Sequence, residues 1–382
     1  MNQGFHIEKE KRQVAAFVSA ILVLAINLLF SYKYLSRFTA FPLLFSGILL
    51  LVLAFIFLVR IPYVSAVFYK PYFYYLLVAC YAALQLVMFR LIQPATLHVD
   101  RWSLIQAFWD AFLKGNYPYA VRSHLNGSVG TMPVYFLLAF PFYLLHEIGY
   151  FSLAGLVVLA IYLRKNHTAG DSLRLLAVVL CSLPVFWEIA VRSTILVNSV
   201  LFLLYTAWIW DTGISKTKNF WIAALLGGLL LSTRTVFSLG LVIYTMYMVR
   251  QREVKLTRIV TWGLLVMAVF CLTLLPFVLL FPGEVLHHNP FRIQSEQLLS
   301  PLLSVMMIAI AMLAGLFVRD KSSLLFLNGL VYLIAFIVFV VHISGEDSLM
   351  HDYLGNRIDV SYSMLAFPFL IAGSALHPAR RS

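Results

Sequence analysis

Long apolar runs separated by short polar loops extend along nearly the whole chain. A helix rises about 1.5 Å per residue, so roughly 20 predominantly apolar residues are needed to cross the hydrocarbon layer of a membrane. Runs close to this length occur at residues 14–30, 40–59, 72–92, 172–190, 196–210, 259–281, 302–318, 324–342 and 360–375. The first run exceeds a signal-peptide core and no A-x-A-like cleavage site follows it, so we interpret it as a retained anchor.

Two further apolar regions are interrupted by polar residues. Residues 131–164 contain the sequence HEIGY at 146–150, and residues 220–250 contain Arg234 within LLSTRTVFS. The second region is predicted to be two short helices with Arg234 near the turn between them. The first region must make one net crossing but is too long for one straight span, so one of its pieces is expected to be partial or strongly tilted. The pattern predicts an all-α polytopic bundle of about 11–13 membrane helices, some short, in a single domain over residues 1–382.

Basic residues gather in alternate loops, which predicts the sidedness of the bundle. Loops with an excess of Lys and Arg face the cytoplasm. The basic segments are RKNH at 164–167, KTK at 216–218, RQREVKLTR at 250–258, RDK at 319–321 and the terminal RR. The opposite, outer side is then expected to hold residues 94–131, 192–198, 282–300 and 344–359.

Composition agrees with this pattern and excludes a soluble protein. Hydrophobic residues make up 62% of the 382 residues and charged residues only 12%, with a mean hydropathy of +0.90. The net charge of +12 would suggest nucleic acid in a soluble protein, but here the basic loops explain it and no nucleic-acid partner is expected. Cys80, Cys181 and Cys271 lie inside apolar runs without metal-ligand spacing, and we expect them to be small core residues.

The stretch DRWSLIQAFWDAFLKGNYPY, residues 100–119, breaks the apolar pattern between two membrane segments. Ile105, Phe108, Trp109 and Phe112 recur at helical spacing, with polar residues largely on the other face. Ser103 and Gln106 have capping-box spacing, Gly115 suits a left-handed stop, and Pro118 prevents continuation. The sequence therefore predicts a helix from about 103 to 114, lying along the membrane surface within an outer loop over residues 94–131.

Several charged residues have both a structural and a functional interpretation. Asp100 is either a solvated or helix-capping carboxylate, or a reactive group at the water boundary. Arg234 is costly between apolar helices unless it reaches water, a carboxylate or a phosphate. Glu188 and Arg192 are expected to pair across one helical turn. The acids and Arg357 of segment 344–359 are expected to form a solvated face, and the adjacent His287 and His288 are expected to be a solvated loop, not metal ligands.

The run at 100–119, followed by MPVYFLLAFPFYLL, resembles the first outer loop and the next helix of GT-C-type glycosyltransferases. The likeness is to the polyprenol-phosphate-mannose-dependent mannosyltransferases in particular. In that class an outer-loop Asp precedes a membrane-parallel helix and a G-x-x-P-Y-like exit, and a helix begun by proline then re-enters the bilayer. The matching positions here are Asp100, Gly115–Tyr119 and Pro133. The chain departs from the class at Val134, where a second proline is common.

The resemblance implies a hexosyltransferase of the cell envelope that moves mannose or another hexose from a polyprenyl-phosphate donor to a lipid or glycan acceptor, by inversion. Asp100 would be the general base, because transfer requires a group that takes the proton of the acceptor hydroxyl. Arg234 would steady the departing phosphate, helped by Arg101, Arg122 or Arg292. Sugar faces would stack on Trp102, Tyr117 and Tyr119. No metal or cofactor is expected, and the implied location is the bacterial inner membrane with the active-site loops in the periplasm.

Two other classes remain open from the sequence. A lipid-linked glycan flippase or transporter would also be polytopic, and Arg234 is the one residue that hints at it. A polysaccharide polymerase or ligase would share the outer-loop chemistry, although a long outer loop late in the chain would be more typical of it.

Overall fold

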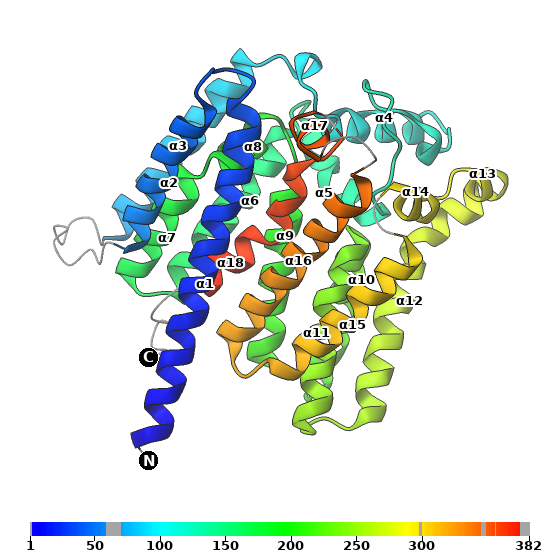
Figure 1. Ribbon diagram of the computed structural model, residues 1–382. Helices are drawn as coiled ribbons and strands as arrows, with labels where there is room; N and C mark the ends of the chain where they lie inside the picture. The colour runs from blue at the N-terminus through cyan, green and yellow to red at the C-terminus, as the bar shows by residue number, and fades with distance from the viewer. Residues whose placement is uncertain (1, 59–69, 298–299, 345–348, 356, 375–382) are drawn as a thin grey trace.

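The computed structural model describes residues 2–58, 70–297, 300–344, 349–355 and 357–374. Every regular element in these residues is a helix, as the sequence predicts. Parts of the predicted runs and loops, at residues 59, 298–299, 345–348, 356, 375 and 380–381, lie outside the described residues. The long helices run side by side, and shorter ones gather at one end (Figure 1).

The first half of the chain forms α1 (Asn2–Leu35), α2 (Pro42–Leu58), α3 (Pro71–Leu91), α4 (Arg101–Leu113), α5 (Pro133–Leu144), α6 (Gly149–Asn166), α7 (Ala169–Cys181), α8 (Leu183–Ala190) and α9 (Ile195–Thr212). The second half forms α10 (Thr217–Leu231), α11 (Ser238–Gln251), α12 (Leu256–Leu280), α13 (Pro282–His287), α14 (Pro290–Gln297), α15 (Pro301–Phe317), α16 (Lys321–Ile343), α17 (Leu349–Leu354) and α18 (Phe367–Gly373). Short 3-10 turns η2 (Pro94–Thr96), η3 (Pro118–Ala120), η4 (Thr235–Phe237) and η5 (Val360–Leu365) join some of them.

Within the described residues, five helices are long and apolar enough to cross a membrane, or seven if each of two bent pairs counts as one span. Four shorter apolar helices accompany them. The prediction of an all-helical chain with apolar helices of membrane-crossing length is thus confirmed, whereas the count of 11–13 membrane helices is not. The span of α9 is 67% buried and that of α12 only 11%, so α9 lies inside the bundle and α12 at its margin.

The run at 172–190 is not the single span that hydropathy predicts. It forms α7 and α8, which are bent by 60° with Ser182 between them. Pro184 lies in the first turn of α8, and proline cannot donate a backbone hydrogen bond to the preceding turn. The last run also differs, because η5 precedes α18 and no continuous helix covers them.

Both interrupted regions form the elements expected of them. α5 and α6 are bent by 110°, with His146 between them at a φ of 56°, so α5 is the partial piece of residues 131–164. α10 and α11 are two short helices with Arg234 in the turn, which confirms that prediction.

Two of the basic connections lie at a different end of the bundle from the short helices of the predicted outer segments. In Figure 1 the basic α11–α12 and α15–α16 connections lie at the end opposite α4, α13, α14 and α17.

The prediction that the three cysteines are core residues is wrong, because Cys80, Cys181 and Cys271 are exposed. Hydropathy cannot separate these cases, because a membrane helix is apolar both toward its neighbours and toward lipid.

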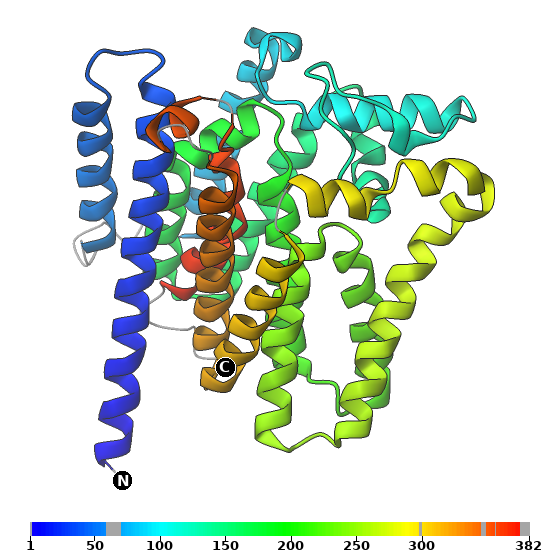
Figure 2. The same ribbon diagram turned by 45° about the vertical axis from the view of Figure 1, so that its right-hand side comes forward.

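Helix α4 lies across the end of the bundle (Figure 2). Its apolar face packs on α5, where the rings of Phe108 and Phe136 stack with centroids 3.6 Å apart, and Trp109 donates to the Phe136 carbonyl at 3.1 Å. The helix begins at Arg101, two residues earlier than predicted, because Ser103 donates to the Asp100 carbonyl and does not cap the helix. Gly115 adopts a φ of 77°, which confirms the predicted left-handed stop.

Candidate functional site

The short α10–α11 hairpin leaves space at the end of the bundle that carries α4. The two helices have 15 and 14 residues, against 25 in α12 and 23 in α16. At about 1.5 Å per residue the hairpin stops on the order of 10–15 Å short of its neighbours. A cavity of about 1060 Å³ lies at its tip, bounded by α12, α15, α16 and the loops around Asp100 and Asp359.

The cavity has one apolar and one polar part. Its apolar lining comes from the bundle helices and includes Met267, Phe270, Met307, Phe336 and Phe339. Its charged lining comes from the hairpin tip, the start of α4 and the segment before η5, and comprises Asp100, Arg101, Arg234, Arg357 and Asp359. Such a cavity suits a ligand with an apolar tail and a charged head.

Asp100 is held by the loop that follows α4. Its Oδ2 accepts a hydrogen bond of 2.8 Å from the Ser123 hydroxyl, which also accepts one of 2.8 Å from the Gly127 amide. A Cβ at Gly127 would lie 2.0 Å from the same Oδ2, so this close approach requires glycine. In the described part of the chain no cation pairs with Asp100, and its side chain makes no helix-capping hydrogen bond. The carboxylate is therefore positioned but not neutralised.

The neighbouring Arg101 is engaged by the protein itself. Its guanidinium forms an ion pair with Asp359 and donates to the Ser193 hydroxyl at 3.2 Å. Burial disfavours the charged form of Asp359, but the Arg101 guanidinium and the Ser361 hydrogen bonds outweigh it and hold the pKa of this carboxyl below its usual value. Asp359 is thus an ion-paired residue of the cavity, where the sequence suggests a solvated face.

Arg234 has no such partner among the described residues. The residue is 8% exposed, its Nε makes no hydrogen bond with the described residues, and its guanidinium carbon lies 5.6 Å from the ring centroid of Tyr135. The turn that carries it is anchored, because the Ser232 carbonyl accepts hydrogen bonds from the amides of Val134 and Tyr135 at 3.0 and 3.3 Å. A buried cation without an anion is costly, so this position favours an anionic ligand.

The predicted pairing of Glu188 with Arg192 is wrong. Arg192 forms a two-pronged ion pair with Glu147 at 3.2 and 3.3 Å and donates to the Phe89 carbonyl at 2.8 Å. Its φ of 60° lies outside the helical region, so its side chain leaves the face on which Glu188 lies. Glu188 instead accepts a hydrogen bond from Ser193.

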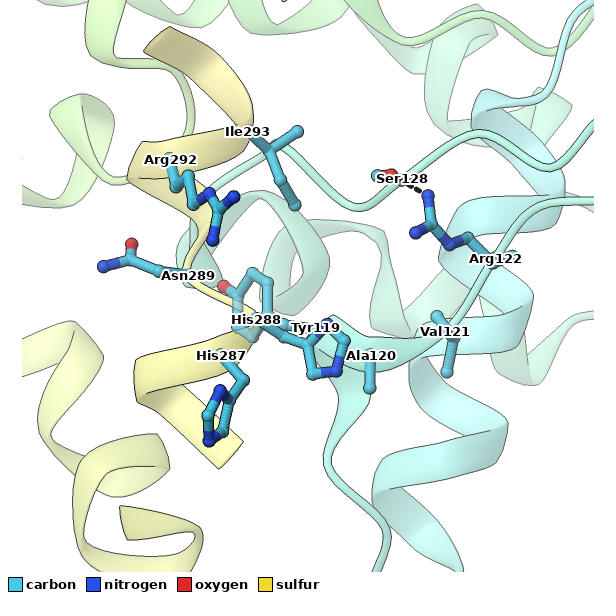
Figure 3. A pocket seen from close by; sticks show the side chains of 10 residues that line it. All are labelled: Tyr119, Ala120, Val121, Arg122, Ser128, His287, His288, Asn289, Arg292 and Ile293. Carbon is cyan, nitrogen blue, oxygen red and sulfur yellow. Dashed lines mark hydrogen bonds between the residues drawn. The ribbon is translucent and has the colours of Figure 1, made fainter. Parts of the chain in front are cut away.

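The remaining predicted residues lie outside the large cavity. Trp102 packs beside His124, with ring centroids 5.0 Å apart. Tyr117 and Tyr119 are buried, and Tyr117 donates to the His288 carbonyl at 3.0 Å. Burial, with a contribution from Glu284, raises the pKa of Tyr117 to about 12. Tyr119, Arg122 and Arg292 line a second pocket of about 260 Å³, shown in Figure 3.

The structure also brings in residues that the sequence did not single out. Tyr135 faces Arg234 and shares a 2.7 Å hydrogen bond with Thr194, while Ser123 and Gly127 hold Asp100. Asp359 is 258 residues from its partner Arg101, and no local pattern connects the two. No group of three or more His, Cys, Asp or Glu side chains in the described residues is arranged to hold a metal ion.

No protein-family model matches this chain, and no curated protein or solved structure matches it either. The resemblance carried by residues 100–141 therefore stays a prediction.

Proposed function

We propose that this chain is a GT-C-type integral membrane glycosyltransferase. It would transfer mannose or another hexose from a polyprenyl-phosphate donor to a lipid or glycan acceptor at the outer membrane face. The observation that carries the proposal is the shared cavity, in which the Asp100 carboxylate and the buried Arg234 guanidinium lie over an apolar wall. Neither has an oppositely charged partner among the residues that the structure describes.

The donor fits the two parts of the cavity. Its phosphate would occupy the charged part at Arg234, whose planar donor fork suits phosphate oxygens. Its polyprenyl chain would follow the apolar lining of α12, α15 and α16, which includes Met267, Met307 and Phe336. Helix α4, across the end of the bundle, would lie along the membrane surface and hold Asp100 at the water boundary.

The reaction is a single inverting displacement. Asp100 takes the proton of the acceptor hydroxyl while the hydroxyl oxygen attacks C1 of the sugar from the face opposite the phosphate. The bond between C1 and the phosphate oxygen breaks, and its electron pair leaves with polyprenyl phosphate. Arg234 stabilises the negative charge that develops on this leaving group.

Asp100 suits the base better than Asp359 does. The ion pair with Arg101 lowers the pKa of Asp359 and therefore its basicity. Asp100 accepts one side-chain hydrogen bond, from Ser123, and has no cationic partner among the described residues. Asp359 is then a positioning residue that fixes Arg101 beside the base.

The test is sugar transfer by purified protein in lipid nanodiscs. Labelled polyprenyl-phosphate mannose and polyprenyl-phosphate glucose are offered with a mixture of membrane glycolipid acceptors, and nucleotide sugars serve as the control donors. We expect product from a lipid-phosphate donor and none from a nucleotide sugar. Transbilayer movement of the donor without sugar transfer would instead support a flippase and contradict the proposal.

A further inference from the structure

We infer that the second pocket binds an anionic group of phosphate type on the acceptor, separately from the donor phosphate. The pocket lies between the loop after η3 and the α13–α14 segment, and measures about 260 Å³ (Figure 3). That the anion belongs to an acceptor rests on the proposed function, whereas the anion site itself can be tested without any transferase activity.

The charge of the pocket carries the inference. Arg122 and Arg292 line it, together with His287 and His288. Arg122 donates to the Ser128 hydroxyl and has no acidic partner in the described part of the chain. Two arginine side chains on facing walls of one pocket favour an anion, and the arginine fork favours phosphate oxygens in particular.

The pocket is built on a fixed scaffold. Tyr117 is buried and ties the two sides together through its 3.0 Å hydrogen bond to the His288 carbonyl. Tyr119 is 2% exposed, lines the pocket, and its hydroxyl has no hydrogen-bond partner within the described residues. A buried hydroxyl without a partner is costly, and a bound polar ligand would remove that cost.

The position of the pocket connects it to the acceptor. Ser128 and Ile293 line both the pocket and the large cavity, so the two spaces adjoin. One loop separates them, with Arg122 lining the small pocket and Gly127 touching Asp100 in the large cavity. An acceptor whose hydroxyl reaches Asp100 therefore has room for a phosphate on the far side of this loop. The acceptor class is a phosphorylated glycan, either linked to lipid by diphosphate or free in water.

The first experiment measures binding of radiolabelled inorganic diphosphate to the full-length protein in nanodiscs. We expect the double variant Arg122→Gln/Arg292→Gln to bind diphosphate at least about tenfold more weakly, because two charge-assisted hydrogen-bonding groups are lost. The variant Lys114→Gln is the matched control, since Lys114 is an exposed cation at the end of α4 that lines neither space. Unchanged diphosphate binding in the double variant would overturn the inference.

The second arm asks whether the two anion sites are separate. Binding of farnesyl phosphate should depend on Arg234 and change little in the double variant, whereas diphosphate binding should show the reverse. Loss of both ligands in both variants would mean one shared site and would contradict the inference.

The third arm identifies the source of the anion through transfer kinetics. The double variant should raise KM for a phosphorylated acceptor and leave kcat and the KM of a neutral acceptor unchanged. Comparison of a lipid-diphosphate glycan with a water-soluble glycan phosphate shows which acceptor responds; a response by neither would overturn the acceptor assignment. Failure of all transfer would refute the proposed function while the diphosphate result still decides the anion site.

Discussion

Two turns between helices of this molecule each bury an arginine, and the two arginines differ in whether a carboxylate pairs with them. At the α8–α9 turn, Arg192 is 1% exposed and pairs with both carboxylate oxygens of Glu147. At the α10–α11 turn, Arg234 is 8% exposed and has no carboxylate partner among the described residues. A paired buried charge holds a structure together, whereas an unpaired one that lines a cavity is available to a ligand.

The same contrast separates the two carboxylates near the start of α4. Asp359 is paired with Arg101, while Asp100 makes one side-chain hydrogen bond with Ser123 and faces the cavity. The paired charges of Arg192 and Arg101 should therefore control folding, whereas Asp100 and Arg234, which face the cavity, should control donor binding and transfer. The following variants test this division, in order of decreasing expected effect.

The largest effect is expected for Asp100→Asn. This change keeps the size of the side chain and its acceptor for Ser123, but it removes the base, so transfer should fall about 10²–10⁴-fold. Steady-state transfer and thermal unfolding of the same preparations measure activity and stability. Asp110→Asn is the control, because Asp110 is exposed and hydrogen-bonded to Tyr143 away from the cavity. Near-normal transfer by Asp100→Asn, or an equal loss in both variants, would exclude Asp100 as the base.

The next effect concerns folding at the paired turn. Glu147→Gln leaves the buried Arg192 charge without its counter-ion and should lower the free energy of unfolding by about 2–3 kcal/mol, since Glu147 itself is partly exposed. Unfolding of the detergent-solubilised protein measures this, with the exposed Glu284→Gln as control. Donor affinity per folded molecule should not change. A loss of donor affinity at unchanged stability would reverse the roles that we give to the two turns.

A smaller effect is expected at the α10–α11 turn. Arg234→Ala should weaken binding of farnesyl phosphate by about 10- to 100-fold, because charge-assisted hydrogen bonds to the phosphate are lost. Arg234→Lys should recover part of this affinity, since a point charge still attracts phosphate. Titration with the labelled lipid measures both. If both variants instead lose folded protein to the same extent, Arg234 has a structural role and its contrast with Arg192 does not hold.

The smallest effect tests how Asp100 is positioned. Gly127→Ala would bring a methyl group to 2.0 Å from the Asp100 carboxylate, so the carboxylate or the loop must shift. Transfer should fall by about tenfold with farnesyl phosphate affinity unchanged, because misplacement of a catalytic group costs rate. Gly283→Ala is the control, since a Cβ there meets nothing within 4 Å. Full activity of Gly127→Ala would mean that the glycine contact does not position the base.

Sequence alone determined the features that depend on neighbouring residues. Apolar length predicted the membrane-spanning helices, Gly115 predicted the end of α4, and the interruption at Arg234 predicted two short helices. These signals are local, because hydropathy, backbone conformation and helix length are set within one segment. The same local logic misplaced the start of α4 at Ser103, where the hydroxyl bonds to the Asp100 carbonyl.

Only the tertiary structure decided which charges are paired and which remain available. Arg192 is four residues from Glu188 but pairs with Glu147, and Arg101 pairs with Asp359 across most of the chain. The hydropathy pattern also predicted one span where α7 and α8 form a bent pair. It predicted the three cysteines in the core, although all three are exposed. The physical reason is common to these cases: a helix presents similar apolar residues to lipid and to protein, and the partner of a charge depends on which distant helix packs beside it.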